Sequence, residues 1–558
     1  MDIGVRSEAL SLRNLFRSGH FFRLPAFQRS YAWDDDEAIA LFNDLRDAMA
    51  LRIPHFIGTI VLVEDPDRPG VLEIVDGQQR LTTLTIIIAA IRDLLGADAS
   101  VRADLVTALC DDSRRQGTRW RLTLNEFDAP FFKATVQESG ATLVGDEHHD
   151  DVQSRERLAG NTKKIVKALR ELPRRELADL AAFVLDGVSL VTVYVADREN
   201  AHRVFMIIND RGKGPNNHDI LKTEILEKSG FSEDEINTYA RQWSSYEARI
   251  RGRGMDDLLQ NIRIIMDNGR TGGPLLATFR KVVLNRLGPS VFMEKVLPAY
   301  VEAEEALQNC ALPGHEKAGP QIENAMRHLS GIEHAMWRSA TLKFIVERGH
   351  DLEAARRFFP LMERLAWAHQ LVFTEKKQRE KRYKRVIEAI DDDRVLFDGE
   401  GPLAISREDS KKIAERLLGR FTSIGQRRAL VMRLNAAMPG GEIVAARSDV
   451  SVEHVLPKSP EDGDYWLTVW PNSAVRAQLT DSIGNFVLLP KEVNTRADRM
   501  HYHDKLKVYF KDGAGDAYAI TRDLHDIHTW TPDVVKRRTV RLANTVLRAW
   551  GLETIPVD

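Results

Sequence analysis

A strand, a tight turn and the start of a helix are predicted by the sequence Val71-Leu72-Glu73-Ile74-Val75-Asp76-Gly77-Gln78-Gln79-Arg80-Leu81-Thr82-Thr83-Leu84. The run from Val71 to Val75 is rich in β-formers and ends at Asp76-Gly77, a typical turn dipeptide. A long apolar helix is expected from about Gln79 to Leu95. Another β-rich run, Ile57 to Val63, precedes the turn that leads into this unit. The first part of the chain should therefore alternate strands and helices.

Helical periodicity dominates the middle of the chain, from about Asp219 to Ala437. Beyond about Gly440, short strands and helices return, and a last helix is expected from about Pro532 to Trp550. We therefore predict an α+β, mostly helical protein. Its expected domains are an N-terminal α/β domain (1–215), a helical middle domain (216–438) and a small C-terminal domain (439–558).

Composition limits the class of protein. The 558 residues carry a formal charge of -3, with 43% hydrophobic and 29% charged residues. These values are ordinary for globular domains, and any affinity for nucleic acid must come from local patches. Cys110 and Cys310 lie far apart, which argues against a disulfide scaffold or a thiolate zinc site. With neither a secretion signal nor a membrane-length apolar run, we expect a soluble, cytoplasmic protein.

The turn Asp76-Gly77-Gln78-Gln79-Arg80 is a candidate phosphate site. Free amides at a helix N-terminus attract phosphate, Gly77 allows close approach, and Arg80 could clamp phosphate oxygens. Asp76 could hold a metal or polarise water. The alternative is a capped helix start, with Asp76 bonded to the amide of residue 78 or 79.

A second group of polar residues lies near the C-terminus. Glu453-His454 precedes Pro457, Gly484-Asn485 precedes an apolar strand, and Asn494 and Lys505 follow. A histidine can deprotonate water near neutral pH. Glu453 and Asn494 offer hard oxygen ligands for Mg²⁺ or Mn²⁺, and Asn485 could orient His454 through the backbone. The alternative is that Glu-His-x-x-Pro occurs by chance in a surface loop.

In order and spacing, this group resembles the HNH (His-Me finger) nuclease module of GmrSD-type restriction enzymes, a ββα-metal fold. The resemblance implies that His454 is the general base and Asn485 the hairpin asparagine. It places Glu453 and Asn494 at the metal, and Lys505 matches a lysine that could touch phosphate. His501 and His503 are alternative ligands.

The N-terminal part resembles the same family at three places. Asp76 to Leu84 is one signature, Pro25 to Trp33 is another, and Ala201 to Lys222 contains Asn209 and Arg211-Gly212 of a third. The resemblance implies a ParB/sulfiredoxin-like domain that binds and hydrolyses a nucleoside triphosphate, with GTP, UTP, CTP and ATP all open. Residues 76 to 80, Asn209 and Arg211 would bind it. Met206 departs from the pattern, because the family often has an acid there.

Gln28, Arg29, Tyr31 and Trp33 combine flat rings with hydrogen-bonding groups, a set that can stack on a base or cradle a modified nucleotide. In related defence proteins this signature is implicated in sensing DNA modification. The alternative is structural: Tyr31 and Trp33 pack on the following helix, and Arg29 pairs with Asp34 to Asp36.

The densest basic run lies between Lys376 and Arg385 and could track a DNA backbone. Its candidate phosphate contacts are Lys376, Lys377, Arg382 and Arg385. The alternative is a solvated helix face. Lys536, Arg537, Arg538 and Arg541 are a second basic candidate, whereas Glu147 to Asp151 is a poor metal site because adjacent ligands in a polar loop rarely converge on one ion.

These features favour a modification-dependent or nucleotide-regulated DNA endonuclease of bacterial anti-phage defence that nicks or cleaves DNA. The alternatives are a nucleotide-gated DNA sensor with a degenerate nuclease, and an RNase or abortive-infection toxin. Expected partners are double-stranded phage DNA, modified or unmodified, and a nucleotide, without a membrane. A homo-oligomer or partner defence proteins stay open.

Overall fold

The computed structural model of the chain describes residues 5–26, 28–65, 68–96, 101–112, 118–144, 153–196, 216–227, 229–250, 254–315, 318–373, 375–443, 449–460 and 465–556. The chain forms two compact units, Met1–Asp256 and Asp257–Asp558. Each is described by itself below.

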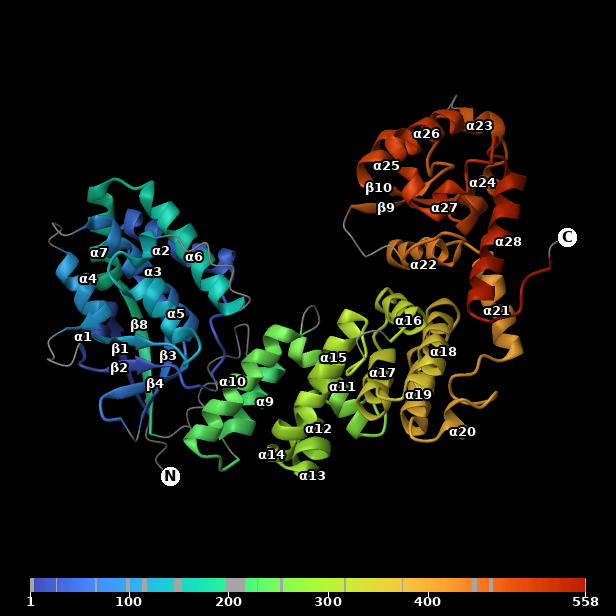
Figure 1. The fold of residues 1–558 in the computed structure, drawn as a ribbon. Coiled ribbons are helices and arrows are strands. Elements are labelled where there is room, and N and C mark those ends of the chain that lie inside the picture. Colours follow the sequence, from blue (N-terminus) through green and yellow to red (C-terminus); the bar gives the residue numbers. More distant parts are fainter. Residues whose placement is uncertain are drawn as a thin grey trace. The chain divides into compact units, whose positions relative to one another are not determined.

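A six-stranded mixed sheet forms the centre of the first unit (Figure 1). β3 pairs with β4 antiparallel and with β8 parallel, and β2 pairs with β4 and β7 in parallel. β1 closes one edge antiparallel to β8. In spatial order the strands are β1 (Arg6–Ser11), β8 (Val188–Val195), β3 (His55–Glu64), β4 (Val71–Asp76), β2 (Phe21–Arg23) and β7 (Leu122–Thr123).

One helix, α3 (Gln78–Leu95), is the core of this unit. It follows β4 after the single residue Gly77, and every residue from Leu81 to Arg92 is buried. Apolar and threonine side chains on all sides of the helix allow it to be covered by other elements around its circumference. These neighbours include α4 (Arg102–Leu109), α6 (Gln153–Arg170) and α7 (Arg174–Asp186). The predicted strand, turn and helix from Val71 to Leu95 are confirmed.

Further helices complete the first unit. They are α1 (Leu12–Arg17), α2 (Asp35–Leu51), α5 (Asp128–Phe132), α9 (Asn217–Glu227) and α10 (Glu233–Arg249), and a small β-ribbon pairs β5 (Cys110–Asp111) with β6 (Arg119–Trp120). Asp34 caps α2 as part of a capping box with Glu37. This cap explains why the chain turns into a helix directly after the Trp33 signature.

Helices also make up the first part of the second unit, as predicted for the middle of the chain (Figure 1). α16 packs on α18, and α17 contacts α15, α18 and α19. α11 (Gly254–Met266) spans the boundary in sequence between the two units. The α-helices after it are α12 (Leu275–Phe279), α13 (Asn285–Leu287), α14 (Pro289–Val291), α15 (Leu297–Asn309), α16 (Pro320–Ser330), α17 (Trp337–Arg348), α18 (Leu352–Leu371), α19 (Lys376–Ala389), α20 (Asp393–Leu396), α21 (Arg407–Leu417) and α22 (Ile424–Ala437).

The C-terminal part is built around an antiparallel strand pair, β9 (Val450–His454) and β10 (Phe486–Pro490), in which His454 lies opposite Phe486. α25 (Lys491–Ala497) follows β10 directly. Buried tryptophans and tyrosines form the core beside this pair. The other helices are α23 (Tyr465–Val469), α24 (Ser473–Leu479), α26 (Tyr502–Tyr509), α27 (Ala519–Arg522) and α28 (Pro532–Ala549). The α+β, mostly helical class is confirmed.

Among the helices that the structure describes, none combines the length and the apolar character that a membrane span requires.

Candidate functional site

His454 occupies the last position of β9, and its ring meets that of Phe486 edge to face, with centroids 5.0 Å apart. The His454 Nε2 atom lies 3.3 Å from Oδ1 of Asp481. A carboxylate can only accept a hydrogen bond, so Nε2 carries the proton and donates it. The lone pair of the neutral imidazole is therefore on Nδ1.

Three cations surround the Asp481 carboxylate. The cationic nitrogens are Arg420 Nη2 at 3.0 Å, Lys458 Nζ at 3.9 Å and Arg427 Nη1 at 4.0 Å. Burial raises the pKa of Asp481, but hydrogen bonds from Arg420 and His454 outweigh that effect, so the pKa lies below its usual range. Among the described residues, three positive groups thus face one carboxylate beside His454, a positive balance that suits a phosphate group.

The protonation state of His454 follows from the same surroundings. Burial, reinforced by the positive charges of Arg427 and Lys458, lowers the pKa of His454 to about 4. The Asp481 carboxylate opposes this shift without cancelling it. Near neutral pH the imidazole is thus uncharged and able to accept a proton.

Glu453 points away from this site, because successive residues of a strand face opposite sides. Its carboxylate accepts hydrogen bonds from Lys505 Nζ at 2.5 Å and Tyr509 Oη at 2.8 Å. The Lys505 side chain is completely buried. Burial raises the pKa of Glu453 and lowers that of Lys505, against the attraction between them. The structure thus places the predicted metal ligand Glu453 and the predicted phosphate contact Lys505 in the interior, as a pair.

Asn485 holds the loop that follows His454. Its Oδ1 atom accepts from the Leu456 amide at 2.8 Å and from Trp530 Nε1 at 3.1 Å. Its Nδ2 atom donates to the carbonyls of Leu456 at 3.0 Å and Thr480 at 2.8 Å. These are positioning contacts made through a fully buried amide. They agree with the loop-holding role expected of this asparagine.

Asn494 lies on α25 and donates from Nδ2 to Ser451 Oγ at 2.9 Å. Ser451 is two residues before Glu453 and so shares its face of β9. The predicted set is therefore divided: Glu453, Asn494 and Lys505 belong to one face of the strand pair and His454 to the other. The metal roles of Glu453 and Asn494 stay predictions without support from these contacts.

The donors beside His454 do not form a good site for a divalent cation. Among the described residues they offer one carboxylate, Asp481, which is already paired with Arg420 and approached by two further cations. Hard cations prefer several oxygen ligands with little competing positive charge. We therefore derive no chemical step through a metal at this position.

Sequence reasoning missed four residues that shape this site: Asp481, Arg420, Arg427 and Lys458. Lys458 follows His454 by four positions and Asp481 precedes Gly484 by three, so the motif region contained a signal for both. Arg420 lies in the segment between α21 and α22, and Arg427 lies on α22, both outside any motif. Proximity along the chain could not have identified them.

In the first unit, the Asp76 to Arg80 turn packs against β3. Gly77 has a φ of 93°, and a Cβ there would approach Ile60 Cγ2 to 2.3 Å. Arg80 donates to the carbonyls of Ile57 at 2.7 Å and Thr59 at 2.8 Å, where the register between β3 and β8 shifts. Its guanidinium also lies 3.5 Å from the Asp76 carboxylate. Arg80 therefore braces an irregular strand, and its phosphate contact stays a prediction.

The two N-terminal signatures bond to each other. Gln79 accepts from the Ala32 amide at 2.8 Å and donates to the Ser30 carbonyl at 3.3 Å. The Gln78 amide donates to the Arg29 carbonyl, and the Gln28 amide donates to that of Val75. The glutamines thus attach the segment before α2 to the start of α3.

The aromatic residues of the Pro25 to Trp33 signature also have structural contacts. The Tyr31 hydroxyl is 2.8 Å from Thr83 Oγ1 and 3.1 Å from Asn161 Nδ2, and its ring is buried. Trp33 is partly buried against the main core. These contacts give both rings a structural place, although the Tyr31 hydroxyl bonds to α3 and α6 and not to the helix that follows the signature. A sensing role stays a prediction.

Two predicted nucleotide contacts, Asn209 and Arg211, lie outside the described residues, as do Met206 and the Glu147 to Asp151 stretch. In the basic run, Lys376 and Lys377 are exposed. Arg382 instead donates to the carbonyls of Pro402, at 2.6 Å, and Ala404. Together with Arg385, Lys381 and His369, it lines a cavity of about 230 Å³.

The chain matches two family models. Residues 12–226 match the N-terminal domain of the GmrSD restriction endonuclease. Residues 408–545 match the C-terminal domain of the GmrSD restriction endonucleases, a span that includes His454, Asp481 and Arg420. A search of curated proteins finds no match. With both of its terminal regions matched to one family, the chain belongs to the GmrSD-type restriction endonucleases.

Proposed function

We propose that this protein hydrolyses DNA phosphodiester bonds at His454. Its family supports a DNA endonuclease of phage defence. The observation that carries the residue assignment is the 3.3 Å contact between His454 and Asp481 inside a group of three cations. It supports an oriented, neutral base beside a place for phosphate.

In the proposed reaction, Nδ1 of His454 takes a proton from the attacking water while the water oxygen bonds to phosphorus. The bond from phosphorus to the leaving oxygen breaks, and that oxygen takes a proton from solvent. Asp481 holds the ring by accepting from Nε2 and stabilises the imidazolium that forms. Arg420 and Lys458 offset the negative charge that builds on the phosphoryl oxygens. Asn485 keeps the loop after His454 in place and touches no reacting atom.

The HNH classification and a requirement for Mg²⁺ or Mn²⁺ are part of the proposal and come from the sequence resemblance. When bound, such an ion would supply charge neutralisation at the phosphate. Nicking assays with EDTA, followed by restoration of each ion alone, test the requirement. Undiminished nicking after complete chelation would remove the metal from the proposal.

Nucleotide control by the first unit is a further part of the proposal. Gly77 has no side chain with which to cap α3, so backbone amides at that helix start are a place for a phosphate group. Calorimetry with GTP, UTP, CTP and ATP tests binding, and Asp76→Ala is expected to weaken it. Cleavage of modified and unmodified phage DNA with each nucleotide tests whether modification is read.

The decisive experiment is plasmid nicking by the full chain with His454→Ala. We expect a loss of about 10³-fold, within the range for a positioned general base, while folding and DNA binding persist. His528→Ala, which removes an exposed histidine of the same unit, is the matched control and should leave the rate unchanged. Wild-type activity in His454→Ala would overturn the assignment of His454 as the base. Faster cleavage of a paired RNA substrate than of DNA would show that the protein is an RNase.

A further inference from the structure

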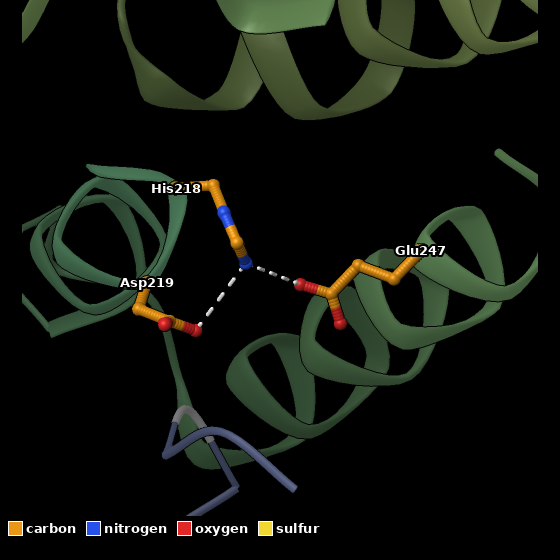
Figure 2. A group of neighbouring side chains, drawn as sticks. All are labelled: His218, Asp219 and Glu247. Atoms are coloured by element: carbon orange, nitrogen blue, oxygen red, sulfur yellow. Dashed lines mark ion pairs between the residues drawn. The ribbon is translucent and has the colours of Figure 1, made fainter. Parts of the chain in front are cut away.

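A second group of titratable side chains lies in the first unit, where α9 and α10 meet (Figure 2). His218 and Asp219 belong to the first turn of α9, and Glu247 lies near the end of α10. One donor atom from each of the three lies within 4.8 Å of the other two. His218 and Asp219 fall within the Ala201 to Lys222 signature, whereas Glu247 lies outside every motif considered above.

Asp256 fixes the orientation of the His218 ring through the Nδ1 side of that ring. Its Nδ1 atom lies 2.8 Å from Oδ1 of Asp256, and the same oxygen accepts from the His218 backbone amide at 2.6 Å. Because a carboxylate only accepts, Nδ1 carries a proton, so the lone pair of the neutral ring is on Nε2. A histidine held by a carboxylate in this way has the arrangement usual for a metal ligand.

The lone pair of His218 faces two carboxylates. Nε2 is 3.6 Å from Oδ1 of Asp219 and 3.7 Å from Oε1 of Glu247, as the dashed lines of Figure 2 show. Both separations are longer than a hydrogen bond. They are close to the about 3.4 Å that separates two ligands bound at about 2.1 Å to a tetrahedral ion. The spacing therefore leaves room for an ion between the donors.

Both carboxylates are anchored by other groups. Asp219 accepts through Oδ2 from the Asn216 amide at 3.3 Å, which leaves Oδ1 toward His218. Glu247 Oε1 accepts from Nε1 of the fully buried Trp243 at 2.9 Å and has a second lone pair available. All three donors thus have an outer contact that sets their direction, as metal ligands commonly do.

The negative charge of the surrounding carboxylates also favours a bound cation. Asp219, Glu247 and Asp256 bring three carboxylates to one imidazole. Lys222, on the same helix as Asp219, directs its ammonium to Ser244 Oγ at 3.5 Å. A divalent ion between the carboxylates would offset their mutual repulsion.

We propose that His218 Nε2, Asp219 Oδ1 and Glu247 Oε1 bind one divalent transition-metal ion of the class of Zn²⁺ or Mn²⁺. Three protein ligands leave a position for water. One nitrogen with two carboxylate oxygens suits these ions better than Ca²⁺, which takes more oxygen ligands. Such an ion would fasten the start of α9 to the end of α10, and it adds a metal site beyond the proposed nuclease.

The test measures bound metal directly in the full chain. Protein stripped with a chelator is dialysed against Zn²⁺ alone or Mn²⁺ alone, and the metal per chain is counted by mass spectrometry. Glu247→Gln keeps the volume and the acceptor for Trp243 but removes the charge. We expect it to bind about one equivalent per chain less than the wild type. The difference between the two proteins is the readout, so an ion bound in the second unit does not affect it.

Asp219→Asn is the second ligand variant, and it keeps the Oδ acceptor for the Asn216 amide. Asp256→Asn leaves the three ligands in place and is expected to weaken binding about 10- to 100-fold. Asp234→Asn, an exposed acid on α10, is the matched control and should bind as the wild type. Equal metal content in the wild type, Glu247→Gln and Asp219→Asn, all folded by circular dichroism, would overturn the proposal. A wild type that binds neither ion at this site would do the same.

Discussion

The two faces of the β9–β10 pair use neighbouring residues differently. On one face, Glu453 is enclosed by Lys505 and Tyr509, and every polar atom named there has a protein partner. On the other, His454 faces Asp481 and three cations, and the lone pair of its neutral ring is on Nδ1. A residue of a motif can thus have a structural role or a role in the reaction. Its contacts in the structure distinguish these two roles better than its position in the motif does.

The largest effect is expected for Glu453→Gln. It leaves the fully buried Lys505 ammonium without its counter-charge, so the free energy of unfolding should fall by about 3–5 kcal/mol. Urea denaturation followed by circular dichroism measures this loss. The double variant Glu453→Gln with Lys505→Met should be more stable than Glu453→Gln alone.

A different outcome would break the comparison between the two faces. If Glu453→Gln keeps its stability and loses nicking activity, the carboxylate acts on the reacting groups. The predicted metal role of Glu453 would then regain support over its role in the buried pair.

Asp481→Asn should act in the opposite way, on catalysis more than on folding. The variant removes the charge that stabilises the protonated His454 ring, so kcat for nicking should fall about 10²-fold with a smaller change in KM. Steady-state nicking across DNA concentrations separates the two constants. Asp526→Asn, an exposed acid of the same unit, is the control. An unchanged kcat would remove Asp481 from the site.

The sequence predicted those parts of the fold that depend on neighbouring residues along the chain. The β4–α3 unit could be foreseen because a β-rich run, a turn dipeptide and an unbroken apolar helix follow one another in sequence. The helical middle was visible for the same reason. The pairing of Arg80 with Ile57 and Thr59 could not be foreseen, because it depends on a register shift between β3 and the distant strand β8.

The candidate nuclease site was predictable only in part. His454 and Asn485 were identified from their motif, and strand alternation could have warned that Glu453 faces away from His454. The cations Arg420 and Arg427 come from a separate part of the chain and meet Asp481 only through tertiary packing. The His218 group depends in the same way on the packing of α9 against α10.

A smaller effect is expected in the first unit, for Gln79→Ala. The variant leaves the Ala32 amide and the Ser30 carbonyl without their side-chain partner, so unfolding free energy should fall by about 1–3 kcal/mol. Thermal and urea denaturation of the full chain measure it, and calorimetry gives the nucleotide affinity in parallel. If the variant keeps its full stability and loses nucleotide binding, Gln79 contacts the nucleotide. Gln79 would then differ from Glu453, whose role is structural.

The smallest effect is expected for the exposed lysines of α19. Replacing Lys376 and Lys377 by Gln removes at most two phosphate contacts, so DNA affinity should fall only a few-fold, and the slope of log affinity against log salt should shrink by about 2. Arg382→Ala is the contrasting variant. Its guanidinium is bound to the Pro402 and Ala404 carbonyls, so it should lower stability and leave the salt slope unchanged. If Arg382→Ala reduces the slope and the lysine variants do not, the phosphate path runs along the cavity beside Arg382, because only groups that displace counterions from DNA alter that slope.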